Sequence, residues 1–349
     1  MKKLLLTAIC AICIEVWAQE SVSPYISRVY EYRPAPGQFI NTLPAYEEGD
    51  TEETMAQKAE ECLADNKQVM ISLGGFGGYV VFGFDHEVLN VAGQYDMKIL
   101  GNSFYSATQK EGDPLGGSSE PGIVMVSRDD NGNGLPDDEW YELAGSEETN
   151  EQTRFGYTIT YYRPDESTPA SEYIRWTDSE GVTGYIPKNS FHSQPYYPEW
   201  IAGGEMTFTG TRLRDNGIDT SGKGTNYVLY CFDWGYADDQ PNEVKDHPER
   251  HVSEFDLDWA VDRNRQKVHL NGIHFVKVYN AMNQVCGWLG ETSTEVLGAY
   301  DLHPEAELPT ALGEIRSASE SSVRKEVRDG RMMIVRNGGR YTLTGQKEE

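Results

Sequence analysis

The chain has 349 residues and a formal net charge of −26, and 38% of its residues are hydrophobic. This length leaves room for one large domain or two ordinary ones with a substantial core. The negative charge repels phosphate backbones and anionic lipid surfaces, which argues against nucleic acid as a partner. Many Tyr (21) and Gly (35) residues, without long Leu-, Ala- and Lys-rich segments, favour β structure with many turns.

The first eighteen residues are typical of a secretory signal peptide. Two lysines precede the apolar run 4–14, and we expect cleavage after Ala18, although the residues before it fit the small-x-small rule imperfectly. A lipoprotein signal that uses Cys10 or Cys13 is the alternative, but both cysteines follow isoleucine where a small residue is expected. We therefore expect export across the inner membrane, to the periplasm or the outer cell surface.

A single helix is predicted near the start of the mature chain, after an extended segment. Asp50 is the predicted N-cap, and Glu53 at the third helical position completes a capping-box spacing. The apolar residues that follow recur at helical spacing, so one face can pack against the body of the domain. We expect a helix over about residues 51–65, with a packed face made of Met55, Ala59, Cys62 and Leu63.

Short β-strand patterns fill most of the remaining chain. They are rich in Val, Ile, Tyr and Phe and are bounded by Gly, Asp, Asn and Pro, which is typical of strands separated by tight turns. The runs are 69–73, 78–85, 95–104, 122–127, 140–144, 157–162, 205–211, 226–234, 267–270 and 274–280. We predict an all-β fold, a jelly-roll-type β-sandwich over residues 19–312 with one N-terminal helix.

Two segments interrupt the strand pattern. Residues 164–204 form a long polar and aromatic insertion, and long loops on a rigid β scaffold commonly carry function. Residues 313–349 begin with a Ser-rich linker and carry more basic than acidic residues. In that tail, two apolar runs flank Asn337-Gly338-Gly339, which predicts a small C-terminal β-hairpin appendage.

The most specific motif is the acidic loop Arg128–Trp140, with the sequence RDDNGNGLPDDEW. With Asp129 as position one, oxygen-bearing residues recur at positions three, five and nine, and glycine stands at position six, as in the first half of an EF-hand calcium loop. Position twelve is Trp140 rather than Glu, and the flanking runs are strand-like. The alternative is an acidic β-turn that binds no ion. The predicted ligands of a structural Ca²⁺ are Asp129, Asn131, Asn133, Leu135 through its carbonyl, Asp137 and Asp138.

Aromatic residues in predicted loops are the candidates for ligand binding. Aromatic faces can stack on sugar rings or on a large planar ligand, whereas the alternative is that they pack into the ends of the sandwich. The candidate ligand-binding residues are Tyr196, Tyr197, Trp200, Trp234, Tyr236 and Trp288.

Catalytic motifs are few. The chain has no G-x-S-x-G, no H-E-x-x-H and no phosphate-binding loop. His247 and His251 share a segment with Pro248 between them, so a polar surface loop is favoured over a zinc site. A glycosidase needs a pair of carboxylates, and the acids that lie among aromatic residues are Glu120, Asp233, Asp256, Asp258 and Glu291.

Several long blocks resemble a family of secreted cell-surface proteins of Bacteroidetes. They include GGFGGYVVFGFDH, YDMKILGNSF, SSEPGIVMVSRDDNGNGLPDDEWYELAGS, FDWGYAD, FDLDWAVD and VCGWLGETSTEV, within residues 28–304. The resemblance implies a place beside outer-membrane uptake systems, some of them for corrinoids, with a transporter or a β-propeller surface protein as partner. The strand pattern also resembles galactose-binding-like jelly rolls, which commonly carry one structural calcium. The tail resembles the C-terminal sorting segments of the same bacteria, but it ends almost at once after Gly345-Gln346.

Three functions remain open at this point. The first is a secreted, calcium-stabilised binding protein without catalytic activity that captures a glycan or a corrinoid-like nutrient. The second is a glycan-cleaving hydrolase with two carboxylates across a cleft beside the loop Tyr196–Trp200. The third is a structural surface protein whose insertion packs flat on the sandwich and leaves no open pocket.

Overall fold

The computed structural model describes residues 22–106, 114–243 and 253–307, together with the backbone of three strands in the tail. The predicted signal peptide and the pair His247 and His251 lie outside the described residues. The chain divides into two compact units, residues 1–304 and residues 305–349. No helix among the described residues is long and apolar enough to cross a membrane.

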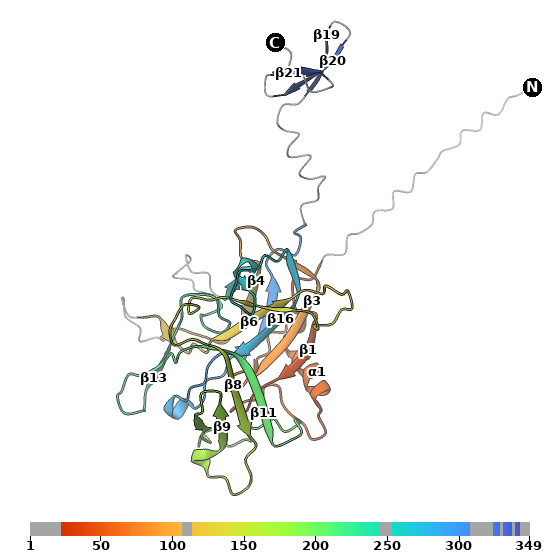
Figure 1. Ribbon diagram of the computed structural model, residues 1–349. Coiled ribbons are helices and arrows are strands. Elements are labelled where there is room, and N and C mark those ends of the chain that lie inside the picture. The colour runs from red at the N-terminus through yellow and green to blue at the C-terminus, as the bar shows by residue number, and fades with distance from the viewer. Residues whose placement is uncertain are drawn as a thin grey trace, which may run out of the picture. The chain divides into compact units, whose positions relative to one another are not determined.

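The larger unit is an all-β sandwich with one α-helix, as the sequence predicts. Its main layer is a six-stranded antiparallel sheet in the order β1-β3-β16-β6-β7-β15 (Figure 1). These strands are β1 (Arg28–Arg33), β3 (Tyr79–Leu89), β16 (Gly272–Asn280), β6 (Gly122–Ser127), β7 (Trp140–Leu143) and β15 (Ala260–Val261).

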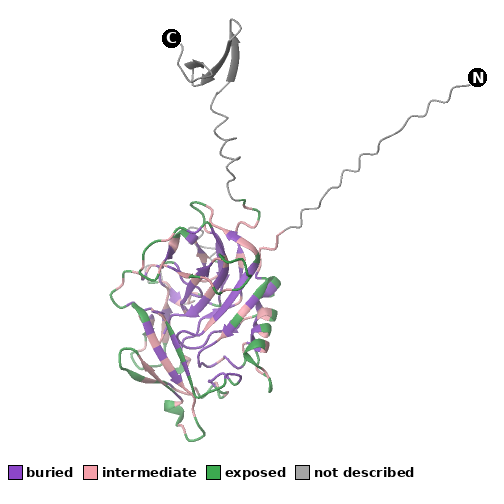
Figure 2. Cartoon of the chain, turned by 45° about the vertical axis from the view of Figure 1, so that its right-hand side comes forward, coloured by how far each residue is buried: buried purple, intermediate pink, exposed green. Residues whose placement is uncertain are grey.

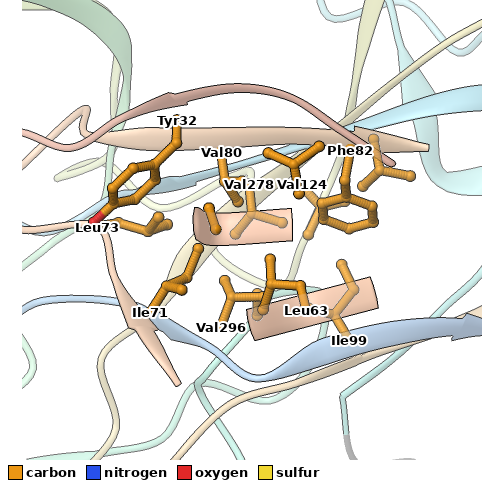
Figure 3. Packing of buried hydrophobic residues seen from close by; sticks show 14 of the residues in the cluster. Tyr32, Leu63, Ile71, Leu73, Val80, Phe82, Ile99, Val124, Val278 and Val296 are labelled. Carbon is orange, nitrogen blue, oxygen red and sulfur yellow. The ribbon is translucent and has the colours of Figure 1, made fainter. Parts of the chain in front are cut away.

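Two small antiparallel sheets form the layer opposite the inner face of this sheet. One has the order β14-β4-β18 and the other pairs β17 with β2. Their bounds are β14 (Glu254–Phe255), β4 (Met97–Leu100), β18 (Gly298–Asp301), β17 (Glu295–Val296) and β2 (Ile71–Ser72). Figure 3 shows Val80, Phe82, Val124 and Val278 of the large sheet facing Ile71, Ile99 and Val296 of the small sheets. All seven side chains are fully buried, so the core of the sandwich lies between these layers.

Helix α1 (Glu52–Leu63) packs beside β1 and buries Met55, Ala59 and Leu63, whereas Cys62 is only partly buried. The predicted cap is one residue too early, because Thr51 is the N-cap and forms a capping box with Thr54. The carboxylate of Asp50 instead accepts hydrogen bonds from Lys58 and from the Thr54 hydroxyl. Asp and Thr are both common N-cap residues, so the sequence pattern alone does not choose between Asp50 and Thr51. In the structure the Asp50 carboxylate is paired with Lys58, and Thr51 caps the helix.

A four-stranded sheet, in the order β10-β9-β8-β11, extends from the sandwich. It contains β8 (Arg154–Tyr162), β9 (Ile174–Asp178), β10 (Thr183–Ile186) and β11 (Glu205–Arg212). The sequence predicts β8 and β11 but treats residues 164–204 as an insertion without strands. The structure places β9 and β10 inside that insertion as a hairpin on the edge of β8. In Figure 2, strands of this sheet alternate buried and exposed residues, as expected for a sheet with one face in water.

A three-stranded sheet in the order β12-β13-β5 completes this unit, with β5 (Gly116–Gly117), β12 (Gly217–Asp219) and β13 (Tyr227–Tyr230). Short 3₁₀ helices are η1 (Ala64–Asn66), η2 (Ala170–Glu172), η3 (Leu257–Trp259) and η4 (Gly287–Leu289). The smaller unit contains β19 (Arg324–Arg328), β20 (Arg331–Arg336) and β21 (Gly339–Thr342) in one antiparallel sheet. Arg336 pairs with Gly339, which confirms the predicted hairpin, and β19 adds a third strand that the pattern did not indicate.

The glycine cluster between β2 and β3 permits a close approach of two backbones. A Cβ on Gly74 would stand 2.0 Å from the carbonyl oxygen of Ala35, and one on Gly78 would stand 1.9 Å from that of Leu73. Gly74 also has φ +70°, which favours glycine. The backbone N–H of Gly74 donates to the hydroxyl of Ser293, 3.0 Å away, so this turn supports the segment that leads into β17.

Candidate functional site

A cavity of about 580 Å³ opens where loops from several sheets of the larger unit meet. Its walls come from the segment after β1, the segment after β4, the end of the insertion, β13 and the segment between η4 and β17. Its volume lies in the range of small-molecule binding sites. Its aromatic lining residues are Phe39, Phe104, Phe191, Tyr227 and Trp288, and its polar ones include Gln38, Asn102, Glu120, Glu291, Thr292 and Glu295.

Three aromatic side chains of this lining are strongly exposed. Phe104 is 59% exposed, Phe191 76% and Trp288 55%, although large apolar side chains are normally buried. Trp288 is nevertheless held in place, because its indole N–H donates to the carbonyl of Thr225 (3.2 Å) and its own carbonyl accepts from Asn189 (2.6 Å). Exposed rings beside a cavity are a ready contact surface for the apolar face of a ligand.

The insertion aromatics Tyr196, Tyr197 and Trp200 do not line this cavity, which corrects their assignment as ligand-stacking residues. All three are buried in the hydrophobic core. Trp200 stacks between Tyr32 and Tyr46, with ring centroids about 6 Å apart in both pairs. Their rings are covered by the protein itself and cannot stack on a ligand. The sequence does not reveal this, because an aromatic-rich insertion looks the same whether it packs inward or outward.

Tyr196 still influences the cavity through the loop before it. Its hydroxyl accepts a hydrogen bond from the backbone N–H of Asn189 (2.8 Å) and donates one to the carbonyl of His192 (2.9 Å). These two hydrogen bonds fix the turn that carries Phe191 and His192, both of which line the cavity. Tyr196 is therefore a positioning residue for one wall of the cavity.

Trp234 and Tyr236 also lie away from the cavity. Tyr236 is buried, and its hydroxyl accepts a hydrogen bond from the backbone N–H of Glu147 (2.9 Å). Trp234 is 42% exposed but packs against Trp259, with ring centroids 4.6 Å apart. Of the six predicted ligand-binding aromatics, Trp288 is the one that lines the cavity, and the predicted set omits Phe39, Phe104, Phe191 and Tyr227.

Acidic side chains meet at one wall of the cavity. One carboxylate oxygen from each of Glu120, Asp238 and Glu295 lies within 4.8 Å of the other two. Glu120 follows β5, Asp238 follows the turn after β13, and Glu295 begins β17, so three distant segments converge here. Glu120 and Glu295 line the cavity, whereas Asp238 is fully buried and does not line it.

Hydrogen bonds hold each of these carboxylates. Asp238 accepts three backbone N–H groups, from Asn102 (2.7 Å), Ser103 (2.9 Å) and Glu295 (2.9 Å). Its backbone has φ 53°, a conformation that residues other than glycine rarely adopt and that often marks functional positions. The side chain of Glu295 accepts from the Ser72 hydroxyl (3.1 Å) and from the Asn102 amide (3.2 Å).

A fourth acid, Glu291, lies on the same wall, two residues from the backbone N–H group of Ser293 that donates to Glu120 (3.0 Å). Glu291 accepts the backbone N–H of Gln38, and its second oxygen, Oε2, is buried without a hydrogen-bond partner. Two more lining residues also have a buried oxygen without a partner, Gln38 Oε1 and Thr292 Oγ1. Buried polar atoms normally have partners, so this wall holds an unusual concentration of unused oxygens.

Burial dominates the acidity of this cluster. Loss of solvation raises the pKa of Glu120 to about 7 and that of Glu291 to about 8. Burial, and then the charge of Glu120, raises the pKa of both Asp238 and Glu295 well above its usual range. The charged groups that influence these four acids are one another, and no Lys or Arg among the described residues acts on them.

The predicted calcium loop joins β6 to β7, between two strands as expected. The side chain of Asp129 accepts the backbone N–H groups of Asn133 and Gly134, both at 2.9 Å. The side-chain amides of Asn131 and Asn133 donate hydrogen bonds to the carboxylate of Asp137, at 2.9 and 3.0 Å. Positions one, three, five and nine therefore converge, and the two amide groups can present oxygen after rotation, so these side chains fit a calcium ion.

The two remaining predicted calcium ligands differ. Asp138 accepts the backbone N–H of Asp130 (3.1 Å) and thereby closes the loop. The backbone N–H of Leu135 donates to the side chain of Asn133 (2.8 Å), and the Leu135 side chain is exposed. The side chain of Glu139, the next acid along the loop, accepts a hydrogen bond from the Tyr141 hydroxyl (3.1 Å). The loop thus offers four converging side chains for an ion.

Neither a scan against models of known protein families nor a search of curated proteins finds a match for this chain. The resemblance to secreted surface proteins of Bacteroidetes therefore stays a prediction from sequence. What the structure defines is a class, an all-β sandwich whose loops enclose a cavity with an aromatic rim and a buried acidic wall.

Proposed function

We propose that this chain is a secreted binding protein that captures a glycan or a corrinoid-like nutrient in the cavity beside Trp288. The observation that carries this proposal is the pairing of exposed rings with buried, unused oxygens in one cavity. Rings stack on the flat apolar faces of sugars and macrocycles, and buried oxygens accept hydrogen bonds from hydroxyl or amide groups. The cavity suits one or two sugar rings, whereas a corrinoid would enter with only part of its structure.

The site also disfavours anionic ligands. Three buried acids and the partly exposed Glu120 lie on or directly behind one wall, and none of the described Lys or Arg residues lines the cavity. A phosphate or carboxylate group would add negative charge to this wall and is repelled. Neutral polyhydroxylated compounds are the ligands that combine stacking faces with many hydrogen-bond donors. This supports glycan ends as the first class to test.

Two further parts of the proposal come from the sequence. Calcium at the loop Asp129–Asp138 would stiffen the connection between β6 and β7, and the four converging side chains support that role. Export by the signal peptide and delivery of the captured nutrient to an outer-membrane transporter or a β-propeller partner follow from the family resemblance. Both parts are independent of the ligand's identity.

Glycan hydrolysis is the second candidate, and one observation favours it. Glu120 and Glu291, two of the acids that the sequence singles out, line the same cavity beside the segment that Tyr196 holds. A carboxylate pair is what glycoside hydrolysis needs. Release of reducing ends from oligosaccharides by the pure protein, abolished in both Glu120→Gln and Glu291→Gln, would replace simple binding by catalysis.

Binding is tested by calorimetric titration of the full chain with neutral oligosaccharides and with cobalamin. Trp288→Ala should weaken binding of the active compound about tenfold, which corresponds to roughly 1.4 kcal/mol of lost stacking. Trp234→Ala is the matched control, because that tryptophan is similarly exposed but lies outside the cavity. Equal affinity in Trp288→Ala and the control, or no binding of any compound, would contradict the proposal.

A further inference from the structure

The three carboxylates of Glu120, Asp238 and Glu295 have the spacing of metal ligands. Two oxygens bound to the same calcium ion at 2.3–2.6 Å can be at most about 5 Å apart. The oxygens of this cluster lie within 4.8 Å of one another, and they come from three segments that the fold brings together. This spacing is compatible with three oxygens that bind one ion after small side-chain adjustments.

The acids of the cluster also need a neutralising positive charge. Three backbone N–H groups donate to Asp238, which is the arrangement that stabilises an ionised carboxylate. Glu295 is buried beside it and Glu120 is partly exposed, and none of the described Lys or Arg residues is paired with any of the three. An uncompensated buried charge is costly, so a positive charge must enter the cluster as protons or as a metal ion.

A second observation points outward from the cluster to a ligand. Glu291 is 6% exposed and Thr292 2%, and each has a side-chain oxygen without a partner on the cavity wall. Glu291 is close enough for the charge of Glu120 to act on it. Glu291 and Thr292 therefore place unpartnered, buried oxygens on the same cavity wall as Glu120 and Glu295.

We propose that Glu120, Asp238 and Glu295 bind one divalent cation of the calcium type, and that this ion uses its cavity-facing positions to bind hydroxyl oxygens of the captured ligand. The three converging side chains offer oxygen alone, which suits Ca²⁺ over Zn²⁺. Calcium accepts six to eight oxygens, so three side chains leave positions for ligand or water. The part that concerns the ligand rests on the proposed binding function, and the ion site does not.

Calcium stoichiometry tests the ion site without any ligand. The measurement uses calorimetry or equilibrium dialysis on the full chain carrying Asp129→Ala and Asp137→Ala, so that the β6–β7 loop cannot contribute. This variant should bind one calcium ion, and adding Glu295→Gln should weaken that binding at least tenfold. Glutamine keeps the shape and an oxygen that can accept the hydrogen bond from Ser72. Glu199→Gln, at an exposed acid outside the cavity, is the matched control and should bind as before.

A second variant guards against loss of the fold. Glu120→Gln keeps an oxygen for the backbone N–H of Ser293 and should weaken calcium binding to the same extent. Absence of calcium binding in the loop variant would overturn the ion site and leave protons as the neutralising charge. Unchanged binding in both Glu295→Gln and Glu120→Gln would also overturn it.

Ligand titrations in calcium and in EDTA test the second half of the proposal. The probe is the neutral oligosaccharide, or cobalamin, that the wild type binds in the calorimetric titration. Its affinity should fall at least tenfold in EDTA, in the wild type and in the loop variant alike. Equal affinity in EDTA would overturn coordination of the ligand by the ion, while the stoichiometry would still stand. A chain that binds calcium at the cluster but none of the compounds would instead contradict the proposed function.

Discussion

Asp238 and Glu295 lie 57 positions apart in sequence, and they are joined directly, since the backbone N–H of Glu295 donates to the carboxylate of Asp238 at 2.9 Å. The same carboxylate accepts the N–H groups of Asn102 and Ser103, so one buried side chain fastens the start of β17 to the segment after β4. Both of these segments line the cavity. Asp238 is therefore the structural centre of the acidic wall.

The first prediction concerns Asp238→Asn. Asparagine also tolerates the backbone conformation at φ 53°, but its amide nitrogen would face at least one N–H donor instead of accepting it. We expect a loss of about 2–4 kcal/mol in the free energy of unfolding, measured by urea denaturation in EDTA. Asp233→Asn, at an exposed neighbouring position, is the control and should change stability by less than about 0.5 kcal/mol. A loss that is equal in both variants would contradict this role of Asp238.

The second prediction concerns the β6–β7 loop. Calcium should raise the melting temperature of the EDTA-stripped protein, and the Asp129→Ala/Asp137→Ala variant should lose that part of the rise. At a calcium concentration of a hundred times Kd, one site contributes about 2.7 kcal/mol. Asp130→Ala is the matched control, because this acid belongs to the same loop but its side chain lies 3.6 Å from Arg128. An identical rise in wild type and double variant would make the loop an acidic turn.

How much of this could be read from the sequence differs between the fold and the site. The short strand runs and the capped amphipathic helix depend on local patterns, and most of them match observed elements. The sequence does not predict the hairpin β9–β10 because its strands have only five and four residues and lie inside a long polar segment. The acidic loop is likewise local, so its convergence follows from spacing within a few residues.

The cavity could not be predicted in the same way. Its acidic wall joins residues such as Glu120 and Glu295 that lie in separate segments, and in a chain with 56 acidic residues no spacing distinguishes them. The local sequence around an aromatic residue does not determine whether its loop packs inward. Trp200 and Trp288 therefore looked equivalent, although one is 8% and the other 55% exposed.

The third prediction separates a positioning role from a ligand contact. Tyr196→Phe removes a buried hydroxyl that brackets Asn189 and His192, and leaves the ring in place. We expect the unfolding free energy to fall by about 1–3 kcal/mol, because two backbone groups lose their partner. Binding at the cavity should weaken as well, because these hydrogen bonds position Phe191, which lines the cavity. Calorimetry with the compound found in the screen measures the second effect, and unchanged affinity with lowered stability would limit Tyr196 to a structural role.

The last prediction is a pH dependence that arises at His86, outside the cavity. His86 Nε2 lies 2.8 Å from the buried carboxylate of Asp301, and Nδ1 lies 2.8 Å from Asp85. The hydrogen bond to Asp301 raises the pKa of His86 above 6.5, and the contact with Asp85 adds to this against the opposing effect of burial.

A histidine whose pKa is higher in the folded state binds its proton more tightly there. Its contribution to stability is therefore fully present below the unfolded pKa and is lost as pH rises through the folded pKa. Urea denaturation between about pH 5.5 and about pH 9 should show the wild type losing on the order of 1 kcal/mol relative to His86→Gln as pH rises. His269→Gln, at an exposed histidine 3.4 Å from Asp258, should show no comparable difference from wild type. A flat difference between wild type and His86→Gln across this range would mean that the two aspartates hold His86 without favouring its charged form.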